Sequence, residues 1–597
     1  MQNVSQEWKD NHKKMLVGES DIELSMRITD PDAYEDASAS DNGSMTFSQT
    51  NDTVSGVEYD MTPTLTFEQN LWILDGSGKV LDKANIGTNR YIGNNICDIN
   101  KTFVKNPLIS LQFSKVHTNL IQGVTIVWST LLDEYAEEFT VTAYNGNTVV
   151  ATRTVTDNSS TKSIVYMDIS NYNKITIEVV KWSLSYRRAR IEEIVIGVDL
   201  SYGKKDLFSY KYTQRVNPLS TELPSIEVSF AIDNLDNSYN PHNVQGLSQY
   251  LIERQEVKVK YGYKINDKTE WINGGVVYLS EWDAPQDGLT AEFKASDLLS
   301  FMRNTYYGGT YYDYDKTLYD LAVDVLTDAN LPTHSDGSVK WKIDESLKSI
   351  YVSTPLPIDT HANCLQLIAN LGCCAISQNR AGILEIKRTY FNINNTADDY
   401  SINYSNSYSK SNTELSKPIK DVRVSVYTPK VSTERQEVAS LSMDVSGTKE
   451  IIMLYDVTAT NVTANITGGT IDEASYYSNA CKLKVSSTGK VSITISGYAV
   501  ETTKSETVIP NQEKGETIAI DNPLITNWYN SYLVGQWVMD FYNKRMTLSS
   551  SWRADPRLDV LDIVSNDNDY GTSNVMMTEV TYDYNGAFKG SGEGKVM

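Results

Sequence analysis

Histidine is scarce in this chain, and the motifs that carry common chemistries are missing. The 597 residues include five histidines: His12, His117, His242, His334 and His361. None stands in a His-Glu-x-x-His pattern, and no Gly-x-Ser-x-Gly or Gly-Lys-Ser/Thr motif occurs. A carboxylate pair for glycoside hydrolysis is formed in space, so the 76 acidic residues leave a cell-wall hydrolase open as the less favoured alternative. We expect no enzymatic activity and no cofactor.

Cysteine is equally sparse, and its spacing gives no disulfide framework. The chain has five cysteines: Cys97, Cys364, Cys373, Cys374 and Cys481. Without Cys-x-x-Cys pairs, they are typical of reduced, buried thiols in a protein made in a cytoplasm. His361 lies near Cys364, Cys373 and Cys374 in the sequence, which raises the alternative of a zinc site. Because His361 and Cys364 would share a helix and adjacent strand cysteines point to opposite faces, we expect core packing and no metal site.

Long apolar runs and an excess of basic charge are absent as well. No stretch of about 18 apolar residues is available to span a membrane, and the polar N-terminus is unlike a signal peptide. The formal charge is -23, and phosphate neutralisation needs basic side chains, so direct nucleic-acid binding is not expected. The plainer interpretation of the acidity is solubility.

Tyrosine and small polar residues are abundant, and they favour sheets with one wet face. The chain has 38 Tyr against 12 Phe, and 40% of its residues are hydrophobic. These numbers predict a folded, mainly β protein, and the length suggests roughly four domains. The clearest strand is 226–232, where Ile226, Val228, Phe230 and Ile232 alternate with polar residues. A second alternating run at 257–261 is its expected pairing partner.

The sequence predicts few helices. Apolar residues at helical spacing predict one over 318–329, capped by Thr317. A second is predicted over 361–371, between the cap Thr360 and Gly372. A last helix is predicted to start at Pro523, with Trp528, Tyr532 and Met539 on one face.

Composition and turn signals divide the chain into six units: an arm (1–60), a β-sandwich (61–200), a β-barrel (201–312), a small α/β lobe (313–417), a second β domain (418–510) and a C-terminal helix with strands (511–597). The arm has one short strand at 22–26 and is expected to lie on a neighbour in this chain or another. Its acidic stretch 30–42 is expected to be a solvated turn, with calcium binding as the alternative. The Ser/Asn/Tyr-rich segment 400–413 is expected to be a linker.

Several strings carry a family resemblance: LSTELP at 219–224, IDN at 232–234, YNP at 239–241, GVVYLSEW at 275–282, TLYDLA at 317–322, CLQLIA at 364–369, WRADPRLD at 552–559 and YNGAF at 584–588. Together they resemble tail-tip or baseplate hub proteins of bacteriophages that infect Gram-positive bacteria. The resemblance implies β-barrel hub domains with a small α/β lobe, a trimer, other tail and baseplate proteins as partners, and a place in the virion. The expected function is a hub that closes the distal tail tube.

Residues 61–200 carry a second resemblance, through NLWILDG at 70–76, EFTVTAY at 138–144 and KWS at 181–183. They look like the discoidin-type jelly roll, which is similar to carbohydrate-binding modules. The rival function is therefore an adhesin for host-surface glycan, with aromatic rings and arginines as contacts. The candidate residues are Trp72, Trp128, Trp182, Tyr186, Arg187 and Arg188. The plainer interpretation is that the tryptophans fill the core and the arginines pair with Glu192 and Glu193.

Overall fold

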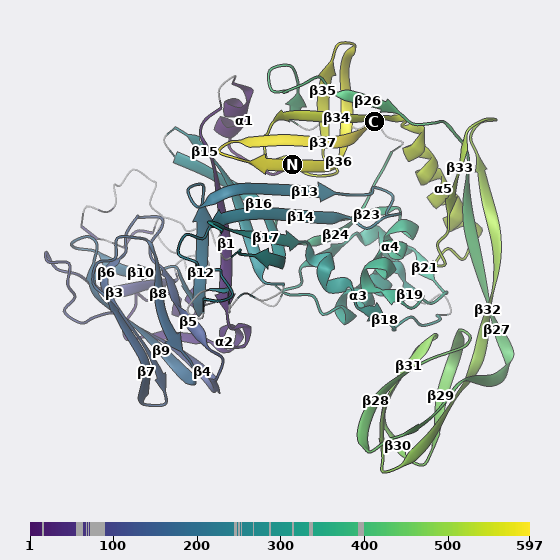
Figure 1. The fold of residues 1–597 in the computed structure, drawn as a ribbon, viewed down its shortest axis with the longest axis horizontal. Helices are drawn as coiled ribbons and strands as arrows, with labels where there is room; N and C mark the ends of the chain where they lie inside the picture. Colours follow the sequence, from purple (N-terminus) through teal and green to yellow (C-terminus); the bar gives the residue numbers. More distant parts are fainter. Residues whose placement is uncertain are drawn as a thin grey trace.

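The computed structural model describes residues 1–14, 17–54, 64–66, 68, 69, 71, 90–243, 247, 248, 251, 254–266, 268–285, 288–312, 316–333, 338–391 and 399–597. The fold is mainly β and multidomain, as the composition predicts. Figure 1 shows a central body flanked by a sandwich on the left and a narrow projection at the lower right. No helix in the described ranges is long and apolar enough to cross a bilayer.

One large sheet, drawn from distant parts of the chain, organises the central body. Thirteen of the described strands belong to it. Its main path runs through β12 (Gly197–Gly203), β1 (Ser20–Thr29), β15 (Glu256–Ile265), β16 (Lys268–Asp283), β17 (Thr290–Ser296), β14 (Ser225–Asp233), β13 (Leu207–Arg215), β36 (Gly571–Tyr584), β37 (Phe588–Val596), β34 (Met546–Arg553) and β26 (Asn412–Leu415). Two further strands, β25 (Ser401–Ile402) and β35 (Ile563–Asn568), pair with each other, and β35 pairs with β36.

The alternation in β14 buries the side chains that it predicts. Ile226, Val228, Phe230 and Ile232 all lie in the core of the main sheet. The predicted pairing with the run at 257–261 is wrong, because β14 pairs with β13 and β17, whereas β15 pairs with β1 and β16. A period of two specifies which face of a strand is buried, and it leaves the neighbouring strand open.

The N-terminal arm lies on its own chain. Its strand β1 pairs with β12 on one side and with β15 on the other, and Ile22, Leu24 and Met26 are fully buried. Ahead of it, helix α1 (Gln6–Lys13) is capped by Ser5 and buries Trp8 against the main sheet.

Residues 30–54 belong to the sandwich. The acidic stretch there forms helix α2 (Pro31–Asp36) and strand β2 (Ser38–Asp41), whereas a solvated turn was expected. A five-stranded sheet runs β2, β4 (Leu108–His117), β9 (Tyr172–Trp182), β6 (Ala136–Asn145) and β7 (Thr148–Val155). It shares one core with the three-stranded sheet β11 (Glu193–Val195), β5 (Ile121–Val127) and β8 (Lys162–Ile169), and β10 (Arg188–Ile191) pairs with β3 (Tyr91–Ile96). The short 3-10 helix η1 (Thr50–Val54) adds Val54 to that core.

The sandwich is fixed to the main sheet by a partly buried cluster of charges. Arg27 of β1 donates from both Nη atoms to the Glu193 carboxylate, at 2.9 Å each. Its Nε also lies 3.6 Å from Asp199, which Lys162 approaches at 3.0 Å. A bidentate guanidinium–carboxylate pair fixes orientation as well as distance.

The lobe contains the two helices that the sequence predicts. They are α3 (Leu318–Asp328) and α4 (His361–Leu371), capped by the side chains of Thr317 and Thr360. They pack with a three-stranded sheet of β20 (Trp341–Ile343), β24 (Leu384–Arg388) and β23 (Cys374–Gln378). The two-stranded pairs β18 (Thr305–Tyr306) with β22 (Asp359–Thr360) and β19 (Lys316–Thr317) with β21 (Tyr351–Val352) complete it, with 3-10 helices η3 (Leu298–Met302) and η4 (Glu345–Ser349).

Two very long strands lead from the lobe to the projection in Figure 1. They are β27 (Ile419–Asp444) and β32 (Lys490–Pro510), and β33 (Glu516–Ile520) joins their upper end. Their lower ends form, with β29 (Ala459–Thr467), one sheet of a separate unit, residues 435–498, that we call the distal β domain. Its other sheet has β28 (Gly447–Leu454), β31 (Ala480–Ser487) and β30 (Thr470–Tyr476).

Two expectations about the C-terminal third are wrong. The last helix, α5, spans Trp528–Asn543 and is capped by Asn527, because the Asn522 side chain instead closes a turn onto the Leu524 N–H. On this helix Trp528 and Tyr532 are exposed and Met539 is buried. Segment 400–413 is no linker: it contributes β25 and the start of β26 to the main sheet.

Candidate functional site

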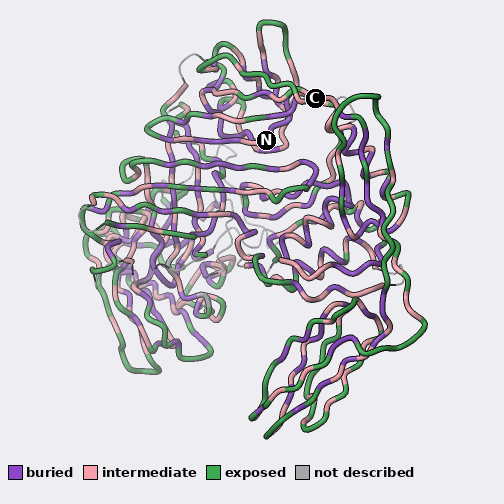
Figure 2. Tube along the Cα trace, turned by 45° about the vertical axis from the view of Figure 1, so that its right-hand side comes forward, coloured by how far each residue is buried: buried purple, intermediate pink, exposed green. Residues whose placement is uncertain are grey.

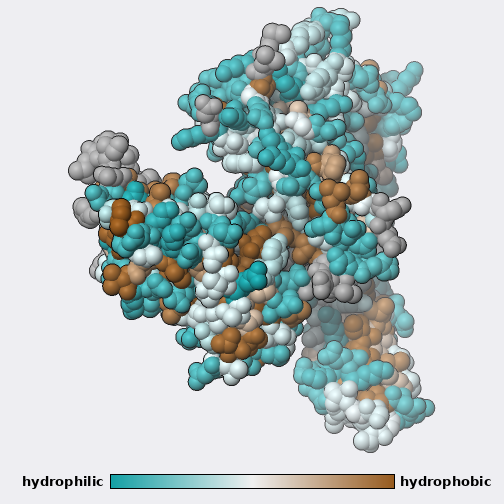
Figure 3. Space-filling view, turned by 60° about the vertical axis from the view of Figure 1, so that its left-hand side comes forward, coloured by the Kyte–Doolittle hydropathy of each residue, from teal (hydrophilic) through white to brown (hydrophobic). Residues whose placement is uncertain are grey.

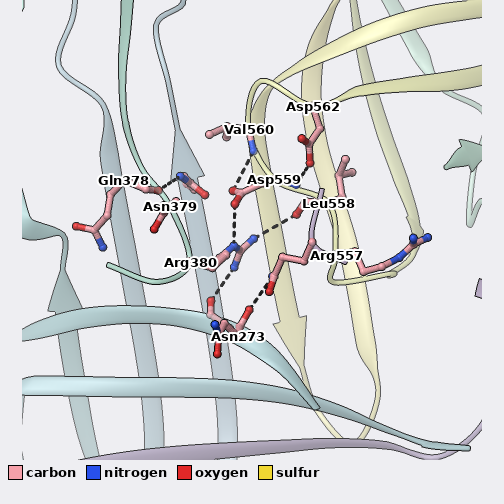
Figure 4. A network of polar contacts seen from close by, with 12 residues as sticks. Asn273, Gln378, Asn379, Arg380, Arg557, Leu558, Asp559, Val560 and Asp562 are labelled. Atoms are coloured by element: carbon pink, nitrogen blue, oxygen red, sulfur yellow. Dashed lines mark hydrogen bonds and ion pairs between the residues drawn. The ribbon is translucent and has the colours of Figure 1, made fainter. Parts of the chain in front are cut away.

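A polar pocket of about 380 Å³ lies where the main sheet, the lobe and the N-terminus meet. We call it the junction pocket. The turn between β23 and β24 enters it from the lobe, and the loop 554–562 between β34 and β35 faces that turn (Figure 4). Its polar lining includes Gln214, Asn273, Gln378, Asn379, Asp559 and Asp562. The turn is the string Asn379-Arg380-Ala381-Gly382, and nothing local in the sequence indicates that Arg380 would be buried.

Arg380, at the tip of that turn, holds the junction together. Its guanidinium donates to the carbonyl oxygens of Gly274 (2.8 Å) and Leu558 (3.3 Å), and its Nε lies 3.4 Å from Asp559 Oδ2. The same group lies over the Tyr212 ring, 4.2 Å from its centroid, and 5.4 Å from that of Tyr582. A buried charge needs such partners. Figure 4 shows Leu558 and Asp559 on one side of Arg380 and Asn273, the neighbour of Gly274, on the other.

The N-terminus closes one side of the pocket. The Met1 ammonium forms an ion pair with Asp562 at 2.5 Å. Gln2 donates its backbone N–H to the Arg557 carbonyl and its side-chain N–H to the Asn273 carbonyl. Burial raises the pKa of Asp562 to about 6, and the ammonium opposes that rise. Beside it, Arg557 pairs with the buried Asp555, whose other contact is the Trp8 indole N–H at 3.1 Å.

The pocket has the chemistry of a joint between segments. Asp559 is bound by Arg380 and Asp562 by the Met1 ammonium, so these carboxylates are already engaged. No histidine or cysteine is among the described residues that line it. In the described ranges there is also no group of three or more His, Cys, Asp or Glu side chains placed to hold a metal ion.

No protein-family model matches the chain, and no curated protein sequence matches it. Its structure is similar to several solved structures. Three of these are tail proteins. They are the 43 kDa tail protein of prophage MuSo2 from Shewanella oneidensis (10% identity, TM-score 0.35, covering 67% of this chain and 95% of that one), the tail protein from Neisseria meningitidis MC58 (9%, 0.37, 67% and 94%) and the prophage tail protein gp18 from Listeria monocytogenes EGD-e (9%, 0.35, 67% and 91%). At these scores the similarity does not assign the chain to a family.

Of the predicted glycan contacts that the structure describes, the two tryptophans do not lie on the surface. Trp72 lies outside the described residues. Trp128 and Trp182 are fully buried in the sandwich core, where their indole N–H groups donate to Ser163 (2.8 Å) and Glu134 (2.9 Å). Their rings are therefore not available to a sugar, and the core interpretation of these two tryptophans is correct.

The arginines of that prediction are tied to the chain itself. Arg187 donates from Nε to Glu134 at 3.0 Å, and Arg188 donates to the carbonyl oxygens of Gly93 and Asn94. Neither pairs with Glu192 or Glu193: Glu193 binds Arg27, and Glu192 accepts hydrogen bonds from Thr130. Tyr186 is the exception, because 40% of it is exposed.

The His361 and cysteine cluster is core, as predicted. His361 lies 2.7 Å from the Asn304 carbonyl through Nδ1 and 2.9 Å from Asp328 through Nε2, so both ring nitrogens are engaged. Cys364, Cys373 and Cys374 are buried, and burial raises the pKa of each thiol. Such thiols stay protonated and are poor metal ligands.

Proposed function

We propose that this chain is a structural component of a phage tail tip or baseplate, a hub that closes the distal tail tube and takes part in host attachment and DNA delivery. The observation that supports it is spatial: two of the strings that carry the family resemblance, at 275–282 and 552–559, lie beside the turn that carries Arg380, although they are far apart in the sequence. Segments 275–282 and 552–559 both border Arg380, through Gly274 as neighbour of the first and Leu558 within the second.

The string at 219–224 contacts the lobe, at α4 and at the start of β23. The Leu219 carbonyl accepts from Asn370 Nδ2 at 3.0 Å, and Ser220 Oγ donates to the Cys374 carbonyl at 2.9 Å. Ser220 has a φ of +47°, a backbone conformation that few residues other than glycine adopt without support. Segment 275–282 contributes to both neighbouring cores, since its Tyr278 lies in the cluster that holds Leu219 and its Val277 in the cluster that holds Leu558.

The proposal includes assembly with further copies, as a trimer, and with other tail proteins. Exposed aromatic side chains on α5 support a protein-binding surface: Trp528 and Tyr529 are 64% and 62% exposed, and Trp528 stacks on Tyr532. Exposed Trp and Tyr are enriched where proteins meet. Figure 3 shows other apolar patches on a mostly hydrophilic surface.

Labelling of phage particles with an antibody against this chain, viewed by electron microscopy, tests the role. Label at the distal end of the tail is expected. Label on the head, or particles that never carry the protein, would contradict it. Native mass spectrometry of the purified chain tests the trimer, and a stable monomer at all concentrations would contradict that part.

Glycan binding by the sandwich is a second candidate, supported by one feature. Loops 97–105 and 183–188 lie side by side, since Ser185 donates to the Ile99 carbonyl, and they expose Ile99, Leu184 and Tyr186. In a cell-wall pull-down of the full chain, Tyr186→Ala should reduce binding at least about fivefold, a loss near 1 kcal/mol. Tyr166→Ala, which removes an exposed ring from β8, is the control. Equal retention of all three proteins would exclude this site.

The proposed function includes no enzymatic activity. Incubation of the purified protein with cell walls should release no soluble fragments, and time-dependent release would contradict it.

A further inference from the structure

The distal β domain is connected to the rest of the molecule by two strands. β33 pairs with β27 only as far as Val424, and β29 joins β32 only from Ala499 toward the distal end. Between these limits, residues 427–431 pair with residues 500–504 and form a stretch that we call the ribbon. No third strand lies beside the ribbon in the described part of the chain. Two-stranded ribbons twist strongly and are weakly supported structures.

Local features make the ribbon the natural place for bending. Residues 501–504 of β32 are exposed, and Figure 2 shows this stretch as mostly solvent-facing. Pro429, near the middle, has no backbone N–H to give to the ladder. Next to the ribbon, three residues of β27, 432–434, lie opposite one residue of β32, Ala499. This mismatch falls between the pairs Val431–Val500 and Arg435–Tyr498. Such a bulge interrupts the ladder and lets the strand bend.

The distal β domain has a core of its own. Val438, Ile451, Leu483 and Ile493 belong to a cluster that is separate from the cores of the lobe, the main sheet and the sandwich. Turning the domain about the ribbon therefore opens no hydrophobic core. Figure 3 shows the domain standing below the body of the molecule.

A small polar contact holds the domain against the lobe. The backbone N–H of Ser478 donates to the Gly309 carbonyl at 2.8 Å, and its Oγ accepts from the Tyr311 N–H at 2.7 Å. Asn479 Nδ2 donates to the Leu356 carbonyl at 3.2 Å. Ser478 is only 1% exposed, so these bonds are shielded from water. Each is worth little in net free energy, so a few of them suffice for a contact that opens and closes.

We propose that the distal β domain turns as one body about the ribbon, and that the Ser478–Asn479 contact is the latch that holds it in the position seen. Opening uncovers the backbone groups of Gly309, Tyr311 and Leu356. The position of the distal β domain thereby controls access to this edge of the lobe.

Hydrogen exchange and small-angle scattering on the full chain test the latch. The variant Ser478→Ala/Asn479→Asp removes the Oγ acceptor and the Nδ2 donor, and it keeps the Oδ1 acceptor that Thr458 uses. The amides of residues 478 and 311 should exchange about tenfold faster or more, and the maximum dimension should change. The amide of Ile493, inside the domain, should exchange as before.

The control Ser442→Ala/Asn465→Asp makes the same chemical changes at exposed positions of β27 and β29 and should alter neither readout. Unchanged exchange at both latch amides together with unchanged scattering would overturn the proposal. Loss of protection throughout residues 435–498 would show unfolding in place of turning, and would overturn it equally.

Discussion

At the scale of single residues, the structure depends on polar groups whose burial the sequence does not announce. Arg380 sits in a four-residue turn, Asn379 to Gly382, that looks solvent-exposed by every local rule. It is buried because the turn is inserted between β16 and the loop before β35, and that insertion is a tertiary event. The same reasoning applies to the tryptophans of the sandwich. The local sequence does not determine whether a Trp in a strand packs in the core or lies on the surface, where it could contact a sugar.

Replacing Arg380 should be among the most damaging single changes in the chain. Arg380→Met leaves the Asp559 carboxylate without its cation and removes the guanidinium donor of two carbonyl oxygens, so we expect a loss of about 3–5 kcal/mol in unfolding free energy. Urea unfolding measures it. Lys387→Met, exposed on the same hairpin, should stay within about 0.5 kcal/mol. A loss below that control level for Arg380→Met would contradict the role of the guanidinium.

Asp297 should make stability depend on pH. Burial raises the pKa of Asp297 to about 6, although the N–H groups of Ile226 and Leu299 donate to it. Between pH about 4 and 6 the folded state therefore binds more protons than the unfolded state, and the contribution of Asp297 to stability falls as pH rises.

Asp297→Asn should remove that contribution, changing the slope by up to about 1.4 kcal/mol per pH unit in this window. Urea unfolding at stepped pH values gives the slope for each protein. Identical slopes for the two would show that this carboxyl titrates normally.

At the scale of elements, periodicity was a good guide to faces and a poor guide to neighbours. The caps of α3 and α4 were predictable, because Thr followed by an apolar stripe at helical spacing is a local signal. The start of α5 was not predictable from the sequence. Asn522 does not cap a helix at Pro523, because its side chain bonds to the Leu367 carbonyl and to Asn370, which lie in α4. Segment 400–413 looked like a linker from composition, yet its serines bond to β34, as in the Ser411–Ser550 contact.

The cap of α3 gives a test at this scale. Thr317 Oγ1 accepts from the Asp320 N–H at 3.1 Å, so Thr317→Ala should cost about 1 kcal/mol of unfolding free energy. Thr317→Ser keeps the hydroxyl and should cost much less. If both variants lose the same amount in thermal or urea unfolding, the methyl group and not the cap is what matters.

At the scale of the whole molecule, the sequence did not predict how the sandwich, the lobe and the main sheet are placed relative to one another. Composition and turn spacing separated the sandwich from the lobe, but the ion pair that orients the sandwich joins residues 166 positions apart. Nothing local marks Arg27 and Glu193 as partners. The junction pocket likewise needs residues from both ends of the chain.

Breaking that ion pair should loosen the sandwich as a unit. Arg27→Met leaves Glu193 without its cation, and the sandwich retains its own core. Differential scanning calorimetry should then resolve a separate transition at lower temperature. Arg153→Met, on exposed β7, is the matched control and should melt like the parent. A single transition that coincides with the parent in both variants would contradict the rigid attachment.

The order of strands in the main sheet has a consequence for biosynthesis. β13 leaves the ribosome roughly 370 residues before β36, the strand that covers its open side, since the pair joins Tyr212 to Tyr582. During that interval one edge of β13 has unpaired backbone N–H and C=O groups. Such an edge pairs readily with strands of other polypeptides. Slow maturation and dependence on chaperones are the expected costs of building one sheet from both extremities of a long chain.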